Sequence, residues 1–107
     1  MEVHNELGHG FLEVVYKDAL EVIFRKNGMF FEREKPYPIY FQKVLLPHMF
    51  YADFVVLDKI ILEIKSIREL RDEHIAQTIN YLKVSGNRLG ILVNFGQEKL
   101  EYKRLVL

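Results

Sequence analysis

The chain has 107 residues, half of them apolar, which fits one domain over residues 1–107 with a real hydrophobic core. It has no cysteine and no apolar run near the roughly 18 residues of a membrane span; this excludes disulfides, thiolate catalysis, cysteine-based metal centres and a transmembrane helix, so we expect a cytoplasmic protein without membrane contact. Lysine plus arginine number 15 and aspartate plus glutamate also 15, so any nucleic-acid-binding surface must concentrate its positive charge locally or borrow it from a partner.

The first part of the chain predicts one helix followed by short strands. Apolar residues recur every fourth position over residues 6–26, which indicates an amphipathic helix. Residues 29–34 then predict a strand, and residues 39–41 predict a second short strand after an interruption at Pro36 and Pro38. Because proline cannot donate a ladder hydrogen bond, we expect both short strands at a sheet edge.

The rest of the chain predicts the centre of the sheet. Residues 48–57 indicate a long strand, and residues 60–65 a shorter one whose nearly continuous apolar character predicts cover on both faces. A second helical pattern follows over residues 70–85, and strands at residues 89–95 and 100–107 end the chain. The order α-β-β-β-β-α-β-β predicts an α/β or α+β domain with a mixed sheet flanked by helices.

Two acids and a lysine interrupt the two central strands. Glu63 and Lys65 share one face of their strand, because side chains alternate. A two-residue turn before this strand would set Asp53 opposite Ile64, on the other face. A three-residue loop, residues 57–59, would set Asp53 opposite Glu63. We favour the odd-length loop or a bulge, because it gathers two carboxylates and one amine on one patch.

Such a patch suits a divalent cation. Two carboxylates about 5 Å apart at their Cβ atoms repel each other and lose hydration. Mg²⁺ takes one or two carboxylates plus waters and phosphate oxygens, so the three groups suit metal-assisted phosphodiester hydrolysis. The lysine would stabilise the nucleophile or the developing phosphate charge. The alternative is a structural ion pair of Lys65 with either acid at a strand end, and the spacing alone leaves it open.

Both predicted helices carry further polar residues at helical spacing. In the second helix, Gln77 and Tyr81 lie on one side together with His74. One flank of the first helix carries a glycine, an acid and a tyrosine three residues apart: Gly10, Glu13 and Tyr16. Solvation at the edge of each apolar stripe is the simpler explanation for each helix taken separately.

Taken together, these residues resemble the GxxExxY proteins of the PD-(D/E)XK nuclease superfamily, and the likeness runs nearly from end to end. The family takes its name from G-x-x-E-x-x-Y, which the first helix matches. Asp53 with Glu63 and Lys65 resembles the superfamily's D…E-x-K signature. Gln77 with Tyr81 resembles the Q-x-x-x-Y helix of its RecB-like branch.

The resemblance implies the restriction-endonuclease-like fold and a metal-dependent nuclease that acts on nucleic acid, with DNA as the expected substrate. It implies Mg²⁺ as the cofactor, with Mn²⁺ as a substitute. The implied metal ligands are Asp53, Glu63 and the Ile64 carbonyl. The implied catalytic residues are Lys65 as the catalytic lysine, with Glu13, Gln77 and Tyr81 in support. One departure is Ala52, which precedes Asp53 where the superfamily name has proline; RecB-like members often lack that proline too.

The small neutral chain also predicts a homodimer. A few basic residues near the expected cleft make few phosphate contacts, so two subunits sharing one duplex would bind better than one. These basic residues are Arg68, Arg71, Lys83 and Arg88. We expect the dimer contact at edge strands or in residues 29–41. Two other readings stay open: an inactive nuclease fold that binds nucleic acid or a protein, and a purely structural subunit of an oligomer.

Overall fold

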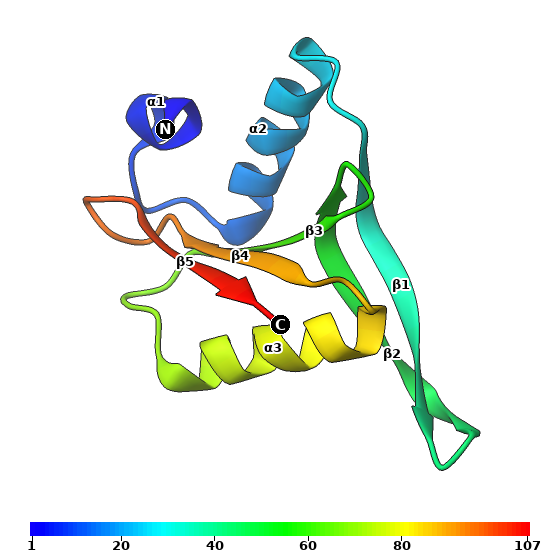
Figure 1. Ribbon diagram of the computed structural model, residues 1–107. Helices are drawn as coiled ribbons and strands as arrows, with labels where there is room; N and C mark the ends of the chain where they lie inside the picture. The colour runs from blue at the N-terminus through cyan, green and yellow to red at the C-terminus, as the bar shows by residue number, and fades with distance from the viewer.

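The computed structural model describes residues 1–107 and is built around one five-stranded sheet (Figure 1). The strands lie in the spatial order β1-β2-β3-β4-β5. Their bounds are β1 Phe31–Phe41, β2 Val44–Val56, β3 Ile60–Lys65, β4 Leu89–Asn94 and β5 Glu101–Val106. β3 and β4 are parallel and every other neighbouring pair is antiparallel, so the sheet is mixed.

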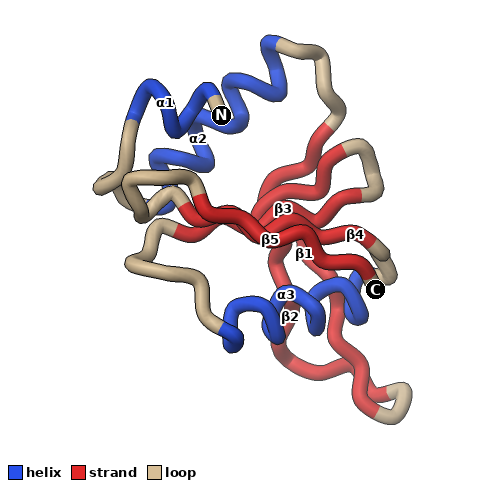
Figure 2. The backbone as a smooth tube through the Cα atoms, turned by 60° about the vertical axis from the view of Figure 1, so that its left-hand side comes forward, coloured by secondary structure: helices blue, strands red, loops and turns tan.

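Helices cover both faces of this sheet (Figure 2). The helices are α1 Glu2–Leu7, α2 Glu13–Lys26 and α3 Asp72–Ser85. α1 and α2 lie on one face, and α3, which connects the parallel strands β3 and β4, lies on the other. The predicted fold class, a mixed sheet flanked by helices, is confirmed. No helix of the chain combines the length and apolarity needed to cross a lipid bilayer.

Each face has its own hydrophobic core. The α1 and α2 face is rich in aromatic side chains: Tyr16, Phe24, Phe54 and Phe95 are buried there beside Leu20 and Ile64. The α3 face is smaller and buries Phe50, Ala52, Val55, Ile61 and Leu82. β3 supplies Ile61 to one core and Ile64 to the other, both fully buried. The prediction that this strand is covered on both faces is therefore confirmed.

The single helix predicted over residues 6–26 is wrong, because the structure has two helices there. α1 ends at Leu7 and α2 starts at Glu13. Gly8 and Gly10 between them have φ angles of 67° and 109°, which an α-helix does not allow. The Tyr16 hydroxyl holds this turn: it donates to the Gly8 carbonyl at 2.7 Å and accepts from the Phe11 N–H at 3.2 Å.

The predicted break at the prolines is also wrong, since β1 runs without interruption through both of them. Pro36 and Pro38 pair with Tyr51 and Met49 of β2. β1 lies at the edge of the sheet, where one side of the strand has no partner and a missing N–H costs nothing. The element order is therefore α-α-β-β-β-α-β-β rather than α-β-β-β-β-α-β-β.

Candidate active site

The candidate site lies where β2 and β3 separate. These strands pair only near their hairpin, at Phe54 with Leu62, Val55 with Ile61, and Val56 with Ile60. The connection is thus the three-residue loop 57–59, and the prediction of an odd-length loop is confirmed. Leu57 and Asp58 have positive φ angles of 55° and 57°, which turn the chain back within this short loop. Continued by one step, the same register sets Asp53 opposite Glu63.

At this position the two carboxylates, rather than backbone carbonyls, accept the hydrogen bonds of the strand N–H groups. The Asp53 N–H donates to Glu63 Oε2 at 2.9 Å, and the Ile64 N–H donates to Asp53 Oδ2 at 2.8 Å. Each carboxylate satisfies a buried backbone donor that would otherwise need a carbonyl partner. The bonds hold Asp53 and Glu63 side by side at the fork of the two strands, so the acids are adjacent, as the favoured register predicts.

Glu63 is a buried acid whose surroundings disfavour its charged form. Glu63 is only 5% exposed. Burial and the neighbouring Asp53 raise the pKa of Glu63 from its usual value near 4.5 to about 8, although the Asp53 N–H, Lys65 and Lys17 act in the opposite direction. A further cation beside this pair would favour the charged form of Glu63 and offset the effect of its burial.

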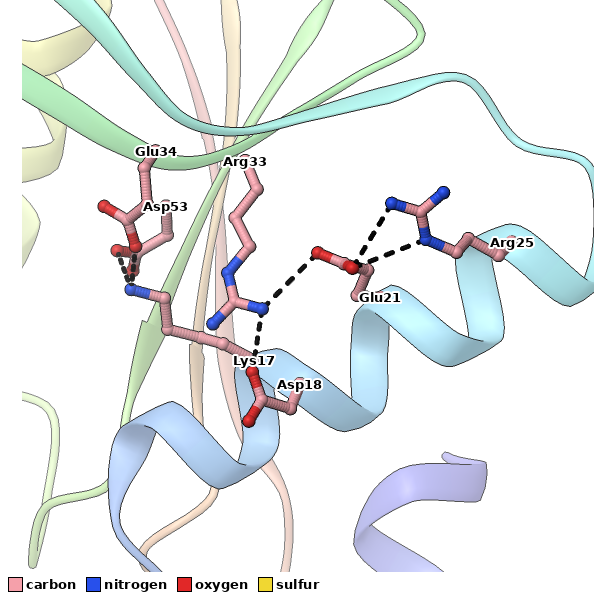
Figure 3. Close-up of polar contacts among 7 residues, drawn as sticks. All are labelled: Lys17, Asp18, Glu21, Arg25, Arg33, Glu34 and Asp53. Atoms are coloured by element: carbon pink, nitrogen blue, oxygen red, sulfur yellow. Dashed lines mark hydrogen bonds and ion pairs between the residues drawn. The ribbon is translucent and has the colours of Figure 1, made fainter.

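Helix α2 brings two charged side chains to the same fork. Glu13 and Lys17 are one helical turn apart. Burial and then Asp53 raise the pKa of the half-buried Glu13, whereas Lys65 and Lys17 lower it. Glu13 therefore lies within electrostatic reach of Asp53 and Lys65. The Lys17 ammonium donates to Asp53 Oδ1 at 3.0 Å and also to Glu34 of β1 (Figure 3).

Lys65 is the last residue of β3 and differs from Lys17 in its freedom. It is partly exposed and forms no ion pair within 4.0 Å. Its backbone is fixed, because the Lys65 carbonyl accepts from the Phe95 N–H at 2.8 Å. The strand end thus holds an ammonium whose base is anchored and whose charge is unpaired.

The chain that follows Lys65 is clamped by Asn94, which the sequence analysis missed. Asn94 is fully buried, and its Oδ1 accepts from the Ile67 and Gly96 N–H groups at 3.0 and 2.9 Å. Its Nδ2 donates to the Ile67 carbonyl and to Glu101. A Cβ at Gly96 would lie 2.0 Å from the Ile67 carbonyl oxygen, so only glycine fits there. The polar residue within an apolar strand was the available signal.

Helix α3 carries two residues predicted for the site, Gln77 and Tyr81, and their contacts differ. Tyr81 stacks on Phe50 at 3.7 Å between ring centroids, and burial followed by Glu63 and Asp53 raises its pKa. Gln77 is exposed, and its contact with Tyr81 acts in the opposite direction on that pKa. Gln77 forms no hydrogen bond with Lys65 or with Asp53 and Glu63. The predicted neighbour His74 serves the helix end instead, where its Nδ1 accepts from the Arg71 N–H.

The donor set at the fork fits a hard divalent cation. No three Asp, Glu or His side chains lie together as a ready-made metal site. Mg²⁺ does not need three, since it binds through one or two carboxylates and keeps several waters. Asp53 and Glu63 supply two adjacent carboxylates, and a bound cation would favour the charged form of Glu63, whose pKa burial and Asp53 raise. Ile64 has a fully buried side chain, so only its backbone can serve this site.

Comparisons with known proteins identify a family and a similar fold. The family model described as the PD-(D/E)XK nuclease superfamily matches residues 1–105. Among solved structures, one titled "Crystal structure of SSO0001" superposes with a TM-score of 0.68 at 21% sequence identity, which supports the fold alone. The match covers 86% of this chain and 48% of the other, so this chain spans about half the length of that protein. No curated protein matches significantly. Because the family model spans nearly every residue, the chain belongs to the PD-(D/E)XK nuclease superfamily.

Proposed function

We propose that this protein is a cytoplasmic metal-dependent nuclease that hydrolyses phosphodiester bonds, with DNA as its substrate. The observation that carries the proposal is the pairing of Asp53 and Glu63 at the β2–β3 fork beside the unpaired ammonium-bearing Lys65. Membership of a nuclease superfamily supports the same reading.

In this proposal Asp53, Glu63 and the Ile64 carbonyl hold Mg²⁺, and Mn²⁺ can replace it. A bound ion would supply positive charge to the phosphate oxygens and an acidified water. The protein's contribution is to fix the two carboxylates. Their hydrogen bonds to the Asp53 and Ile64 N–H groups orient both side chains before substrate arrives, which reduces reorganisation during the reaction.

Lys65 is assigned the role of catalytic lysine. Its anchored backbone and unpaired charge leave the ammonium able to donate to the attacking water or to a phosphate oxygen. In the same proposal Glu13, which α2 brings to this fork, orients water next to Asp53 and Lys65; the influence of both residues on its pKa supports this role. Tyr81, assisted by Gln77, is assigned a supporting role from α3, because Glu63 and Asp53 act together with burial to raise its pKa.

We further assign the chain to the GxxExxY, RecB-like branch, since the local structure gives each residue of that motif a distinct task. Gly10 supplies a φ of 109° that turns the chain into α2. Glu13 opens α2 facing the fork. Tyr16 is fully buried, pins the turn through the Gly8 carbonyl and stacks on Phe95 at 4.5 Å.

Nucleic acid is the proposed partner, and two subunits are proposed to share it. The β1–β2 hairpin extends away from the body of the fold (Figure 1) and exposes an apolar set at its end: Tyr40, Phe41, Val44 and Leu45. Contact between copies at β1 or at this end would double the basic residues that face one duplex. Sedimentation at micromolar concentration should show a dimer; a strict monomer with tight DNA binding would contradict this part.

Cleavage of labelled DNA and RNA tests the function. We expect products with Mg²⁺ or Mn²⁺, none in EDTA, and cleavage about 10²–10³-fold slower by Lys65→Ala with either metal. Equal cleavage by Lys65→Ala and the unmodified protein would assign the activity elsewhere. Because the net charge is zero, a nuclease fold that only binds nucleic acid is the second candidate, and metal-independent binding without cleavage would favour it.

A further inference from the structure

The carboxylate pair at the fork already has a cation beside it, supplied by the protein. The Lys17 ammonium lies between Asp53 and Glu34 and contacts both (Figure 3). The side chains of Lys17 and Asp53 are only 12% and 14% exposed, so this pair is shielded from solvent, whereas Glu34 is 49% exposed. The arrangement is a shared cation with one buried and one solvated partner.

An incoming metal ion must compete with Lys17 for Asp53. Asp53 Oδ2 is committed to the Ile64 N–H, and this bond ties β2 to β3. Asp53 Oδ1 is the oxygen that binds Lys17, at 3.0 Å. A cation that uses Oδ1 keeps the strand bond intact but meets the ammonium at the same atom. Two positive charges so close together repel strongly in a partly buried site.

The second partner of Lys17 is held in place by an unusual backbone. Glu34 has a φ of 53°, which is disfavoured for any residue other than glycine. Arg33 pairs with Phe54, and Lys35 pairs with Ala52, but Glu34 and Asp53 between them do not appear as a ladder pair. This local irregularity places the Glu34 carboxylate over Lys17, at the solvent edge of the fork.

We propose that Lys17 is an internal counter-ion of the metal site. Lys17 neutralises and orients Asp53 while no divalent cation is bound. When the cation takes Asp53 Oδ1, the Lys17 ammonium moves away from Asp53 and keeps only its ion pair with Glu34. Lys17 and Glu34 together therefore set the metal concentration at which the site fills. The inference rests on the proposed metal-dependent function and assigns positioning roles to two residues outside the D…E-x-K signature.

The test is Mn²⁺ affinity, measured as free Mn²⁺ by electron paramagnetic resonance without substrate. Lys17→Met removes the competing charge and should lower the Kd about tenfold, which is the effect of a modest local repulsion. Glu34→Gln removes the alternative partner, keeps Lys17 on Asp53 and should raise the Kd several-fold. Lys35→Met is the matched control. The Lys35 ammonium pairs with Glu32 at 3.1 Å rather than with the fork, so the Kd for Mn²⁺ should change less than about twofold in this variant.

A double variant separates this mechanism from a general change of charge. If Glu34 acts through Lys17, Glu34→Gln should have little further effect in the Lys17→Met background. Equal effects of Glu34→Gln in both backgrounds would overturn the transfer. Equal effects of Lys17→Met and Lys35→Met would overturn the competition. Lys17→Gln, which retains a polar side chain, replaces Lys17→Met if that variant does not fold.

The outcomes also separate this inference from the proposed function. Mn²⁺ binding that Asp53→Asn abolishes but Lys17→Met leaves unchanged would overturn the role of Lys17 while the metal site stands. Mn²⁺ binding that is absent from the unmodified protein and from Lys17→Met alike would overturn the metal site itself, and the role of Lys17 with it.

Discussion

The two ends of the β2–β3 strand pair are built on different principles. At the hairpin end, Phe54, Val55 and Val56 pair with β3 through regular backbone hydrogen bonds, and their side chains enter the two cores. One residue further on, backbone pairing stops, and the carboxylates of Asp53 and Glu63 accept the strand N–H groups instead. Stability at the first end comes from apolar burial; at the second end, polar side chains fill the gap at an electrostatic cost.

The acids at the fork therefore have a structural task besides any chemical one. A variant of Asp53 loses a strand-to-strand bond and its contact with Lys17 at once. Its effect on activity would therefore be mixed with an effect on folding. Lys65 makes no such contacts through its side chain, so it offers the cleaner probe of chemistry.

The largest effect is expected from Phe54→Ala at the hairpin end. Phe54 is fully buried, and its ring packs edge-on against Phe24 at 5.3 Å and near Phe31 at 6.0 Å. Deleting it leaves a cavity in the aromatic core, so the free energy of unfolding should fall by about 3–5 kcal/mol. Urea unfolding measures this, with Phe54→Leu as a milder control. A loss below about 1 kcal/mol would show that the hairpin end does not depend on this packing.

At the fork, Lys65→Ala should leave stability nearly unchanged but should strongly reduce activity. Because the ammonium forms no ion pair, the free energy of unfolding should change by less than about 0.5 kcal/mol. The rate of metal-dependent DNA cleavage should fall about 10²–10³-fold, as expected for the loss of one charge-stabilising group. Lys59→Ala is the matched control, since Lys59 is exposed in the loop just before the other end of the same strand. A large loss of stability in Lys65→Ala would assign the lysine to the architecture.

The pH dependence of stability should reveal the electrostatic cost at the fork. Burial and Asp53 raise the pKa of Glu63 to about 8 in the folded protein, whereas the unfolded chain titrates near 4.5. Between these values the folded state holds a proton that the unfolded state has lost, so stability must decrease as the pH rises through this window. In EDTA the decrease should amount to a few kcal/mol.

The matched variant for this prediction is Glu63→Gln, which has no carboxyl group to titrate. Its stability in EDTA should be nearly flat over the same pH range, and at pH 8 it should exceed that of the unmodified protein. Thermal unfolding at a series of pH values measures both chains. Parallel pH profiles for the two chains would mean that Glu63 is not the group responsible.

The fold class could be predicted because strand periodicity and burial depend on local sequence. The nearly continuous apolar character of residues 60–65 required cover on two faces, and the helices provide it. Helix ends were harder. The apolar repeat continues through Gly8 and Gly10, so periodicity alone did not reveal the turn that the Tyr16 hydroxyl stabilises through its hydrogen bond to the Gly8 carbonyl. The prolines do not break β1, because the cost of a proline depends on the position of the strand in the sheet, and β1 lies at the edge.

The candidate site could be predicted in part, for a related reason. Asp53 and Glu63 follow from side-chain alternation once the loop length is chosen, and the register bears out that choice. Lys17 could not be found in this way, because a lysine on an amphipathic helix is usually solvated. Glu34 was hidden as well, since its positive φ breaks the alternation on which strand predictions depend. The roles of all these residues in chemistry stay predictions.

The smallest expected effect comes from Tyr16→Phe, which tests whether the fork depends on how α2 begins. The change keeps the ring stacked on Phe95 but removes the hydroxyl that bonds the Gly8 carbonyl and the Phe11 N–H. The free energy of unfolding should fall by about 1 kcal/mol, the usual net value of hydrogen bonding of this kind.

Hydrogen exchange at the Phe11 amide should accelerate more than exchange in β3, because the loss is local. Tyr102→Phe, at an exposed site on β5, should change neither quantity. Because α2 carries Glu13 and Lys17 to the fork, a looser start of the helix should also weaken Mn²⁺ binding slightly. Unchanged exchange at Phe11 would show that the glycine turn holds its shape without the tyrosine.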